Sequence, residues 1–157
     1  MSWGFYTSAG SQKVGSATNI VQTVKTTSFS TASTSFTDVT GLAVSITPRS
    51  SSSLVLVTVS IFTGNSGNNL HTFNLLRGST NLAQPSADTY SGSMNASVGT
   101  ATDQTVSLTF LDSPATTAAT TYKIQMKVSG GTGYVCRRGD LASVSAASII
   151  TAQEIPQ

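Results

Sequence analysis

Charged side chains are scarce in this sequence of 157 residues. Asp, Glu, Lys and Arg make up 9% of it, against roughly 25% in ordinary soluble domains. The eight basic residues are scattered along the chain, and the formal net charge is only +2. Non-specific binding to nucleic acid depends on several Lys or Arg side chains that neutralise phosphates together. We therefore expect no nucleic-acid partner.

Cysteine and histidine occur once each, as Cys136 and His71. One cysteine excludes an internal disulfide, and no Cys/His cluster is present that would bind a metal. His71 lies in an alternating run beside Phe73, which favours a packed strand histidine over a catalytic base. Free cysteine is commonly a small buried hydrophobe, and we expect this of Cys136. The sequence leaves a Cys136–His71 pair open, but nothing local supports one.

Long hydrophobic runs are also missing. No run approaches the ~20 apolar residues that a helix needs to cross a bilayer, and the longest candidate, LVLVTVSIF at 54–62, has the length of a strand. The first residues, MSWGFYTSAGSQKVG, lack the basic-then-apolar order of a secretory signal. We expect synthesis in a cytoplasm and no membrane partner.

The sequence offers no arrangement of catalytic groups. Glycosidases use two carboxylates that flank the scissile bond, whereas the six acids here are dispersed and mostly adjoin turns, where Asp usually bonds its own backbone. The glycine groups GNSG and SGGTG do not follow the phosphate-binding pattern. We predict that the chain is not an enzyme and binds no cofactor or metal.

Serine and threonine are abundant instead, with 26 Ser and 25 Thr among the 157 residues. About a third of the positions therefore carry a small hydroxyl group, so the surface is polar with few charges. Threonine is β-branched and favours strands, while Ser, Asn and Gly favour turns. This composition suits β-structure.

Hydrophobic residues alternate with polar ones over most of the chain, which is the pattern of strands with one buried face. Turn sequences such as PRSSSS, GNSGNN, RGSTN and SGGTG separate the alternating runs. Several short strands with this punctuation predict an all-β fold, an antiparallel β-sandwich of jelly-roll type. We place it in residues 20–157 as a single domain, with a short N-terminal arm at 1–19. The alternating runs lie at 42–46, 71–77, 106–110 and 122–128. The run 54–62 is apolar on both faces at its start, as expected of a central strand covered on both sides, and 144–155 is strand-like with less distinct faces.

Two regions depart from this alternation. Residues 82–102 are predicted to form a long loop, of the kind that often carries function or lies at an interface. The arm at 1–19 holds Trp3, Phe5 and Tyr6, three of the eleven aromatic residues of the chain. These rings are candidate anchoring residues. They either cover one end of the domain's own core or dock onto a partner chain.

Five segments occur in an order that resembles a module of tailed-bacteriophage virion proteins, especially tail-fibre-like and structural proteins of cyanophages. They are FTDVTGLAVSITPRSSSS, LVLVTVSIF, FNLLRGSTNLAQPS, LDSPATTAATTYKIQMKV and a Tyr-Val-x-Arg-Arg-Gly run, within residues 20–155. The resemblance implies a jelly-roll β-sandwich, often trimeric, that is made in the host cytoplasm and displayed on the virion exterior without a catalytic role.

Two functions fit this resemblance. We favour a capsid decoration or cement protein that acts as a homotrimer and binds the major capsid protein, because a compact knob with a short arm suffices for that role. The alternative is a tail-fibre or receptor-binding module that joins tail proteins and recognises the host surface, with a glycan as a possible ligand. A lectin-like binding domain stays open as a third function.

The run YVCRRGD, from Tyr134 to Asp140, contains an RGD tripeptide. Adhesive RGD loops act on animal-cell receptors, so we interpret the tripeptide here as coincidence. A strand-end arginine can bind carboxylates or carbonyls through its planar fork. We therefore expect Arg137 or Arg138 to fix a contact within or between subunits, with Gly139 making the turn.

Overall fold

The computed structural model describes residues 19–86 and 88–157, and every regular element in these ranges is a β-strand. The strands follow one another as β1 (Ile20–Lys25), β2 (Phe29–Thr31), β3 (Thr37–Ile46), β4 (Leu54–Asn65), β5 (Asn69–Arg77), β6 (Thr80–Leu82), β7 (Met94–Val98), β8 (Asp103–Asp112), β9 (Thr120–Val128), β10 (Gly133–Val135) and β11 (Ser148–Ile155).

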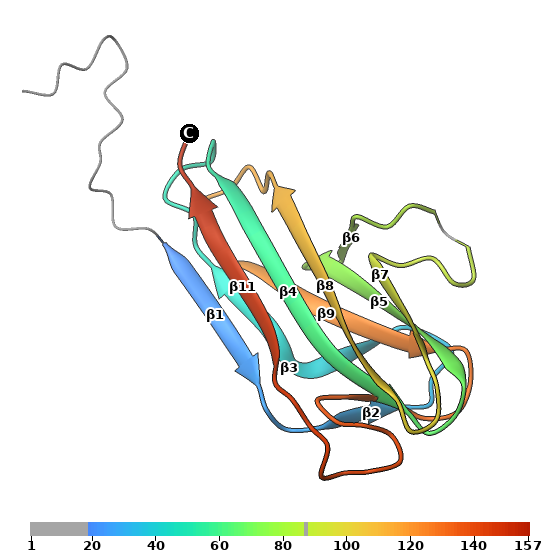
Figure 1. Ribbon diagram of the computed structural model, residues 1–157. Coiled ribbons are helices and arrows are strands. Elements are labelled where there is room, and N and C mark those ends of the chain that lie inside the picture. The colour runs from blue at the N-terminus through green and yellow to red at the C-terminus, as the bar shows by residue number, and fades with distance from the viewer. Residues whose placement is uncertain (1–18, 87) are drawn as a thin grey trace, which may run out of the picture.

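The strands form two facing antiparallel sheets (Figure 1). Sheet A has the order β1-β11-β4-β8. The short strands β2 and β10 extend it, because β10 pairs with residues 63–65 of β4 beyond the end of β11. Sheet B has the order β3-β9-β5-β7. The three-residue strand β6 pairs with the same edge of β5 as β7 does, one step further along.

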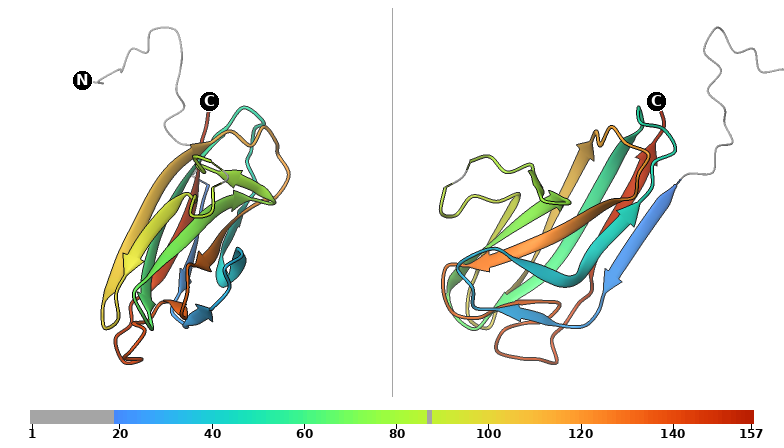
Figure 2. Two further views of the ribbon diagram at one scale, coloured as in Figure 1. Left: turned by 90° about the vertical axis from the view of Figure 1, so that its right-hand side faces the viewer. Right: turned by 180° about the vertical axis from the view of Figure 1, so that it is seen from behind.

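This strand order is that of a jelly roll. Neighbours within each sheet are distant in the sequence, and the first and last strands, β1 and β11, lie side by side. The order β1-β11-β4-β8 facing β3-β9-β5-β7 corresponds to two Greek keys wrapped into a sandwich. Figure 2 shows the two layers edge-on and from behind. The predicted fold class, an all-β antiparallel sandwich of jelly-roll type, is confirmed.

The core fills the space between the sheets. Alternate residues of each strand face inward, as the period of two predicts. The inward faces of β4 and β9 supply many of the large buried side chains, which include Val55, Val57, Val59, Ile61, Tyr122, Ile124 and Met126. Phe73 and Leu75 of β5 and Ile150 of β11 are also fully buried against them.

A bulge bends β3. Its pairing with β9 shifts register between Asp38 and Ala43, and Gly41 within the shift has a φ of +81°. Residues with a side chain rarely adopt this left-handed conformation. Glycine therefore lets β3 curve, so that its two ends pair with different stretches of β9.

The structure corrects two expectations about the strands. Residues 82–102 are not one loop, because Met94–Val98 form β7 with a regular buried-exposed alternation. The inward residues include the small Ala96, so the hydrophobic signal is weak. In β4, the sequence predicts coverage of both faces at its start, but Leu54 and Leu56 are only half-buried there. Coverage of both faces occurs at its other end, from Phe62 to Asn65.

Candidate functional site

His71 is a structural residue of the core, as the sequence predicts. Its side chain is fully buried, and both ring nitrogens are bonded across the sandwich to β4. The Asn65 amide donates to Nε2 at 2.6 Å, so Nδ1 carries the proton and donates to the Thr63 hydroxyl at 2.8 Å. Thr63 in turn donates to the Tyr134 carbonyl at 2.7 Å. Burial lowers the pKa of His71 to about 4, so the ring is neutral at pH 7.

Cys136 is buried as well, and no hydrogen bond joins it to His71. Its thiol lies 3.2 Å from the Lys25 carbonyl and 3.3 Å from the Ser148 hydroxyl. Its backbone N–H donates to the Phe62 carbonyl, and its φ is +65°. The residue thus fixes the point where the chain leaves β10 and turns across the end of β4.

Asp112, at the end of β8, connects the two sheets. Its carboxylate accepts from Arg77 Nη1 of β5 at 2.8 and 2.9 Å, and from the Tyr122 hydroxyl of β9 at 2.6 Å. Burial and then the bond to Asp112 raise the pKa of Tyr122. Each member of this cluster satisfies the others, so it is a structural tie and not a catalytic pair.

Glu154 lies at the same end of sheet A as Asp112, since both pair with Val55. It accepts from the Arg49 backbone N–H at 2.7 Å and from the Asn19 side chain at 3.1 Å. Burial acts to raise the pKa of Glu154, but bonds from Ser53, Arg49 and Asn19 outweigh burial and hold the pKa below its usual value. In the described ranges no group of three His, Cys, Asp or Glu residues could bind a metal. Those ranges also contain no helix that could span a bilayer.

The two arginines of the YVCRRGD run make local contacts. Arg137 stacks 4.4 Å over the Tyr134 ring and donates to the carbonyls of Arg138 and Gly139. Arg138 binds Asp140 through a fork, at 2.7 and 3.2 Å. This bond lowers the pKa of Asp140 and joins the Arg and Asp of the RGD tripeptide to each other. A contact of either arginine with another subunit stays a prediction.

Close backbone approach explains the glycine of this run. A Cβ on Gly139 would overlap the backbone of Asn65, and a Cβ on Gly64 would lie 2.7 Å from the Arg137 carbonyl oxygen. The segment after β10 therefore crosses closely over the end of β4, and each of the two backbones has a glycine at the crossing, Gly139 and Gly64. Gly139 does not have a positive φ, so its role is close approach.

Three rows on the outer face of sheet A are uncharged, and the charged Asp103 of β8 lies beyond them. The rows follow from the register of the four strands: Ile20, Gln153, Leu56 and Leu111 form one row, and Gln22, Thr151, Thr58 and Thr109 form the next. A third row holds Val24, Ile149, Ser60 and Ser107. These twelve positions carry only aliphatic, hydroxyl and amide side chains.

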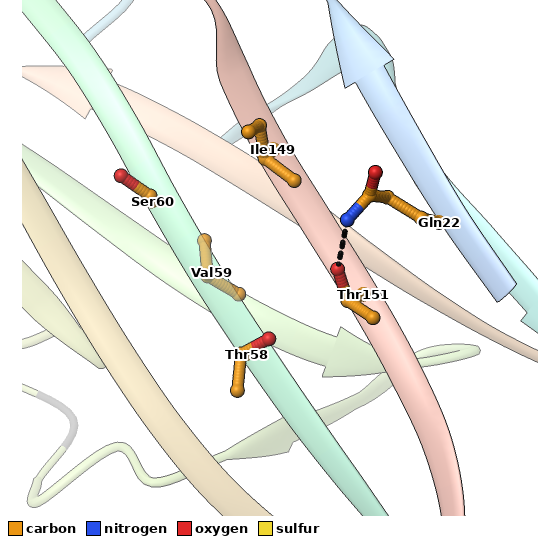
Figure 3. Close-up of a pocket in the computed structure, with 6 residues that line it drawn as sticks. All are labelled: Gln22, Thr58, Val59, Ser60, Ile149 and Thr151. Atoms are coloured by element: carbon orange, nitrogen blue, oxygen red, sulfur yellow. Dashed lines mark hydrogen bonds between the residues drawn. The ribbon is translucent and has the colours of Figure 1, made fainter. Parts of the chain in front are cut away.

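An open depression of about 250 Å³ lies in the middle of this face. Figure 3 shows the residues that line it, from β1, β4 and β11: Gln22, Thr58, Val59, Ser60, Ile149 and Thr151. The Gln22 amide donates to the Thr151 hydroxyl at 3.0 Å. The depression thus presents hydroxyl and amide groups without a charge.

One end of the same face is aliphatic. We call this the end patch: Ile20, Leu54, Leu56, Leu111 and Ile155. Ile20, Leu56 and Leu111 share a row, and Leu54 pairs with Ile155 beside them. Ile20 is 52% exposed and Leu111 51%. Sequence analysis missed this patch because its members come from four strands that are neighbours only in the folded sheet.

The outer face of sheet B differs. Asp38 of β3 binds Lys123 and Gln125 of β9, each at 2.8 Å. In the segment 88–93, Gly92 and Ser93 lie against β5, because a Cβ on Gly92 would be 2.6 Å from the Phe73 carbonyl oxygen and the Ser93 hydroxyl accepts from the Leu75 N–H. Lys127 reaches this segment and donates to the Thr89 carbonyl at 2.6 Å. The outward face of sheet B thus carries bonded charged side chains, beside exposed uncharged residues such as Ser45, Ser97 and Thr121.

The three proposed anchoring residues, Trp3, Phe5 and Tyr6, lie outside the described residues, as does the rest of the predicted arm up to residue 18. Asn19 begins the described chain. Its carbonyl accepts from the Glu154 backbone N–H, and its side chain donates to the Thr47 carbonyl. The arm therefore joins the sandwich at the end of sheet A that carries the end patch.

No protein-family model matches this sequence, and no curated protein does. Among solved structures, the chain is similar to one of infectious bursal disease virus, Gt strain, with a TM-score of 0.49 and 12% identity. A structure of the Gx strain gives 0.43 and 14%. The alignments cover 97% and 95% of this chain but only 43% and 42% of those chains. Neither structure comes from a tailed phage, and the strand order itself defines the fold.

Proposed function

We propose that the chain is a non-enzymatic structural protein of a virion. The jelly roll is an architecture of viral capsid domains, although lectin domains and cupins share it. The order of five sequence segments, which resembles tailed-phage virion proteins, favours the first of these. The observation that carries the proposal is the three uncharged rows on the outer face of sheet A, which suit contact with another protein.

The chemistry of this face explains why it suits an interface. Burying a charge without a partner costs far more than burying a hydroxyl that finds a hydrogen bond. Thr58, Thr109 and Thr151 expose hydroxyls in one row, and a partner's backbone groups can bond them. Aliphatic rows on either side add apolar area, which favours association.

Within this class we propose a capsid decoration or cement protein on the virion exterior. It acts as a homotrimer, because every copy of the subunit interface is occupied in a closed symmetric oligomer. It also binds the major capsid protein. Trp3, Phe5 and Tyr6 contact neighbouring shell subunits on the particle, and Arg137 or Arg138 contributes to subunit contacts. Light scattering that returned the mass of a single chain at micromolar concentration would exclude the trimer.

The test compares virions assembled with and without the protein. The proposal predicts many copies per particle on the head, counted by quantitative gel or mass spectrometry, and a loss of resistance to heat and osmotic shock without them. Particles that lack the protein and resist both stresses as the wild type does would exclude the cement role. A few copies confined to the tail would favour the alternative.

That alternative is a tail-fibre or receptor-binding module that recognises the host surface. The depression between β1, β4 and β11 favours it, because the Gln22 amide and the hydroxyls of Thr58, Ser60 and Thr151 match the hydroxyls of a glycan. Purified protein should then adsorb to host cells and block infection. Thr151→Val should abolish both effects without loss of folding, and undiminished infection in excess free protein would contradict this role.

A further inference from the structure

The end patch lies where the undescribed N-terminal residues join the fold. Ile20 belongs to the patch, and Asn19 precedes it directly. Asn19 is held by Glu154 and Thr47, so the point of attachment is fixed. Eighteen residues of chain therefore begin at the edge of an exposed aliphatic surface.

The chemistry of these residues complements the patch. Residues 1–18 carry a single charged side chain, Lys13, and three aromatic rings within four positions, Trp3, Phe5 and Tyr6. Large aromatic side chains gain most from burial against aliphatic surface. No charge on the outer rows of sheet A opposes their approach.

We propose that residues 1–18 of the same chain cover the end patch, with Trp3, Phe5 and Tyr6 packed on Ile20, Leu56 and Leu111. The twelve residues between Tyr6 and Asn19 span at most about 40 Å. The four strands of sheet A are only about 15 Å across, so every member of the patch is within reach.

Because residues 1–18 and the end patch belong to the same chain, residues 1–18 dock on the patch in preference to a second copy of the protein. A short linker gives its ends an effective concentration in the millimolar range, which exceeds the concentration of other copies in a micromolar solution. The docking occurs in the free subunit and does not depend on the proposed virion function. It identifies what shields the aliphatic end of sheet A before any partner binds.

Trp3 is the only tryptophan of the chain, so its fluorescence reports the docking directly. In the full-length protein, the emission of Trp3 should be blue-shifted and protected from acrylamide, relative to a peptide of residues 1–18. The emission should not change between low and high micromolar concentration. Emission and quenching equal to those of the peptide would overturn the proposal.

A pair of matched variants tests the location. Leu111→Gln, in the patch, should lower the docking equilibrium constant about fivefold, because a half-exposed leucine contributes about half of its full burial energy. Leu141→Gln replaces a leucine of similar exposure, 45%, in the segment after β10, at the opposite end of the sandwich (Figure 1). It should leave the emission unchanged, and equal effects of the two variants would overturn the location.

Mixing identifies the occupant. A Trp3→Phe, Ser51→Cys, Cys136→Ser chain that carries an acceptor dye at residue 51, which is exposed and lies just before β4, should show no energy transfer from Trp3 of an unlabelled chain. The same dye on a chain that retains Trp3 should quench that tryptophan. Transfer between chains that rises with concentration would show that a second copy is the occupant, and the proposal would fail.

Discussion

The two outer faces of the sandwich differ in chemistry although the sheets are similar in size and strand order. Sheet B presents Asp38, Lys123 and Lys127, and Gly92 and Ser93 lie against β5. Sheet A presents three rows of Thr, Ser, Gln and aliphatic residues without a charged side chain, and in the described chain the segment after β10 covers only its far end, at Phe62 to Asn65. On sheet B, Asp38 and Lys127 are bonded within the chain, whereas Thr58, Ser107 and Thr109 of sheet A are exposed.

The residues that hold the two sheets together are different from those that are exposed on the outer face of sheet A. The bonds that hold the sheets together run through the interior, at Asp112 and His71, and at the Glu154 corner. Neither outer face is needed for them. Residues on the outer face of sheet A can therefore be substituted without loss of these bonds. Function in proteins resides in such sites and is not determined by the fold.

The largest effect is expected where the sheets are joined beneath both faces. Asp112→Ala leaves the Tyr122 hydroxyl and the Arg77 guanidinium without their carboxylate. Breaking such a buried pair should lower the free energy of unfolding by about 3 to 4 kcal/mol, measured by urea denaturation. A loss below 1 kcal/mol would mean that the tie between the sheets lies elsewhere.

Acid should weaken the second tie, between His71 of β5 and its partners in β4. The folded-state pKa of His71 is about 4, below the unfolded value of about 6.5. The unfolded chain therefore binds the proton first, and stability present above pH 6.5 is lost as the pH falls toward 4. This group should contribute a loss of about 3 kcal/mol. His71→Gln should remove this part of the pH dependence, and an unchanged slope would contradict the assignment.

A third pair of variants compares the faces directly. Gly92→Ala places a methyl group 2.5 Å from Thr72 Cγ2 and 2.6 Å from the Phe73 carbonyl oxygen. It should push the segment 88–93 off sheet B and cost about 1 to 3 kcal/mol. Thr58→Ala at an exposed position of sheet A should change stability by no more than about 0.5 kcal/mol. Thermal melts that rank the two variants in the opposite order would break the comparison.

The smallest effect is expected for the exposed ion pair of sheet B. Hydrogen bonds from Lys123 and then Gln125 lower the pKa of Asp38. Its contribution is present above the unfolded pKa and is lost as the pH falls through the lower folded value. Asp38→Asn should cost well under about 1 kcal/mol, and less in high salt. A salt-independent loss would point to a role beyond charge.

Alternation in the sequence predicts the fold class because a period of two depends only on neighbours along the chain. It identifies β9 and most of β4 and β8. It misses β7, where Ala96 gives a weak signal, and it places the doubly covered part of β4 at the wrong end. That coverage comes from the segment after β10, about seventy residues later in the sequence.

The candidate surfaces are harder to predict because their residues are distant from one another in the sequence. Their rows depend on register, which joins Ile20 to Gln153, Leu56 and Leu111 across four strands. The bonds of Asp112 to Arg77 and Tyr122 likewise join three separate strands. Burial of His71 and Cys136 could be predicted from their alternating, apolar neighbours, whereas their partners could not.

The most direct test of the central claim is binding to virions that were assembled without the protein. Thr58→Lys places a charge on the outer face of sheet A, and Thr121→Lys places the same charge on sheet B. We predict that the wild type and Thr121→Lys restore a full complement of copies per particle, while Thr58→Lys remains folded and does not bind. Equal binding of the two variants, or no binding of the wild type, would contradict the account.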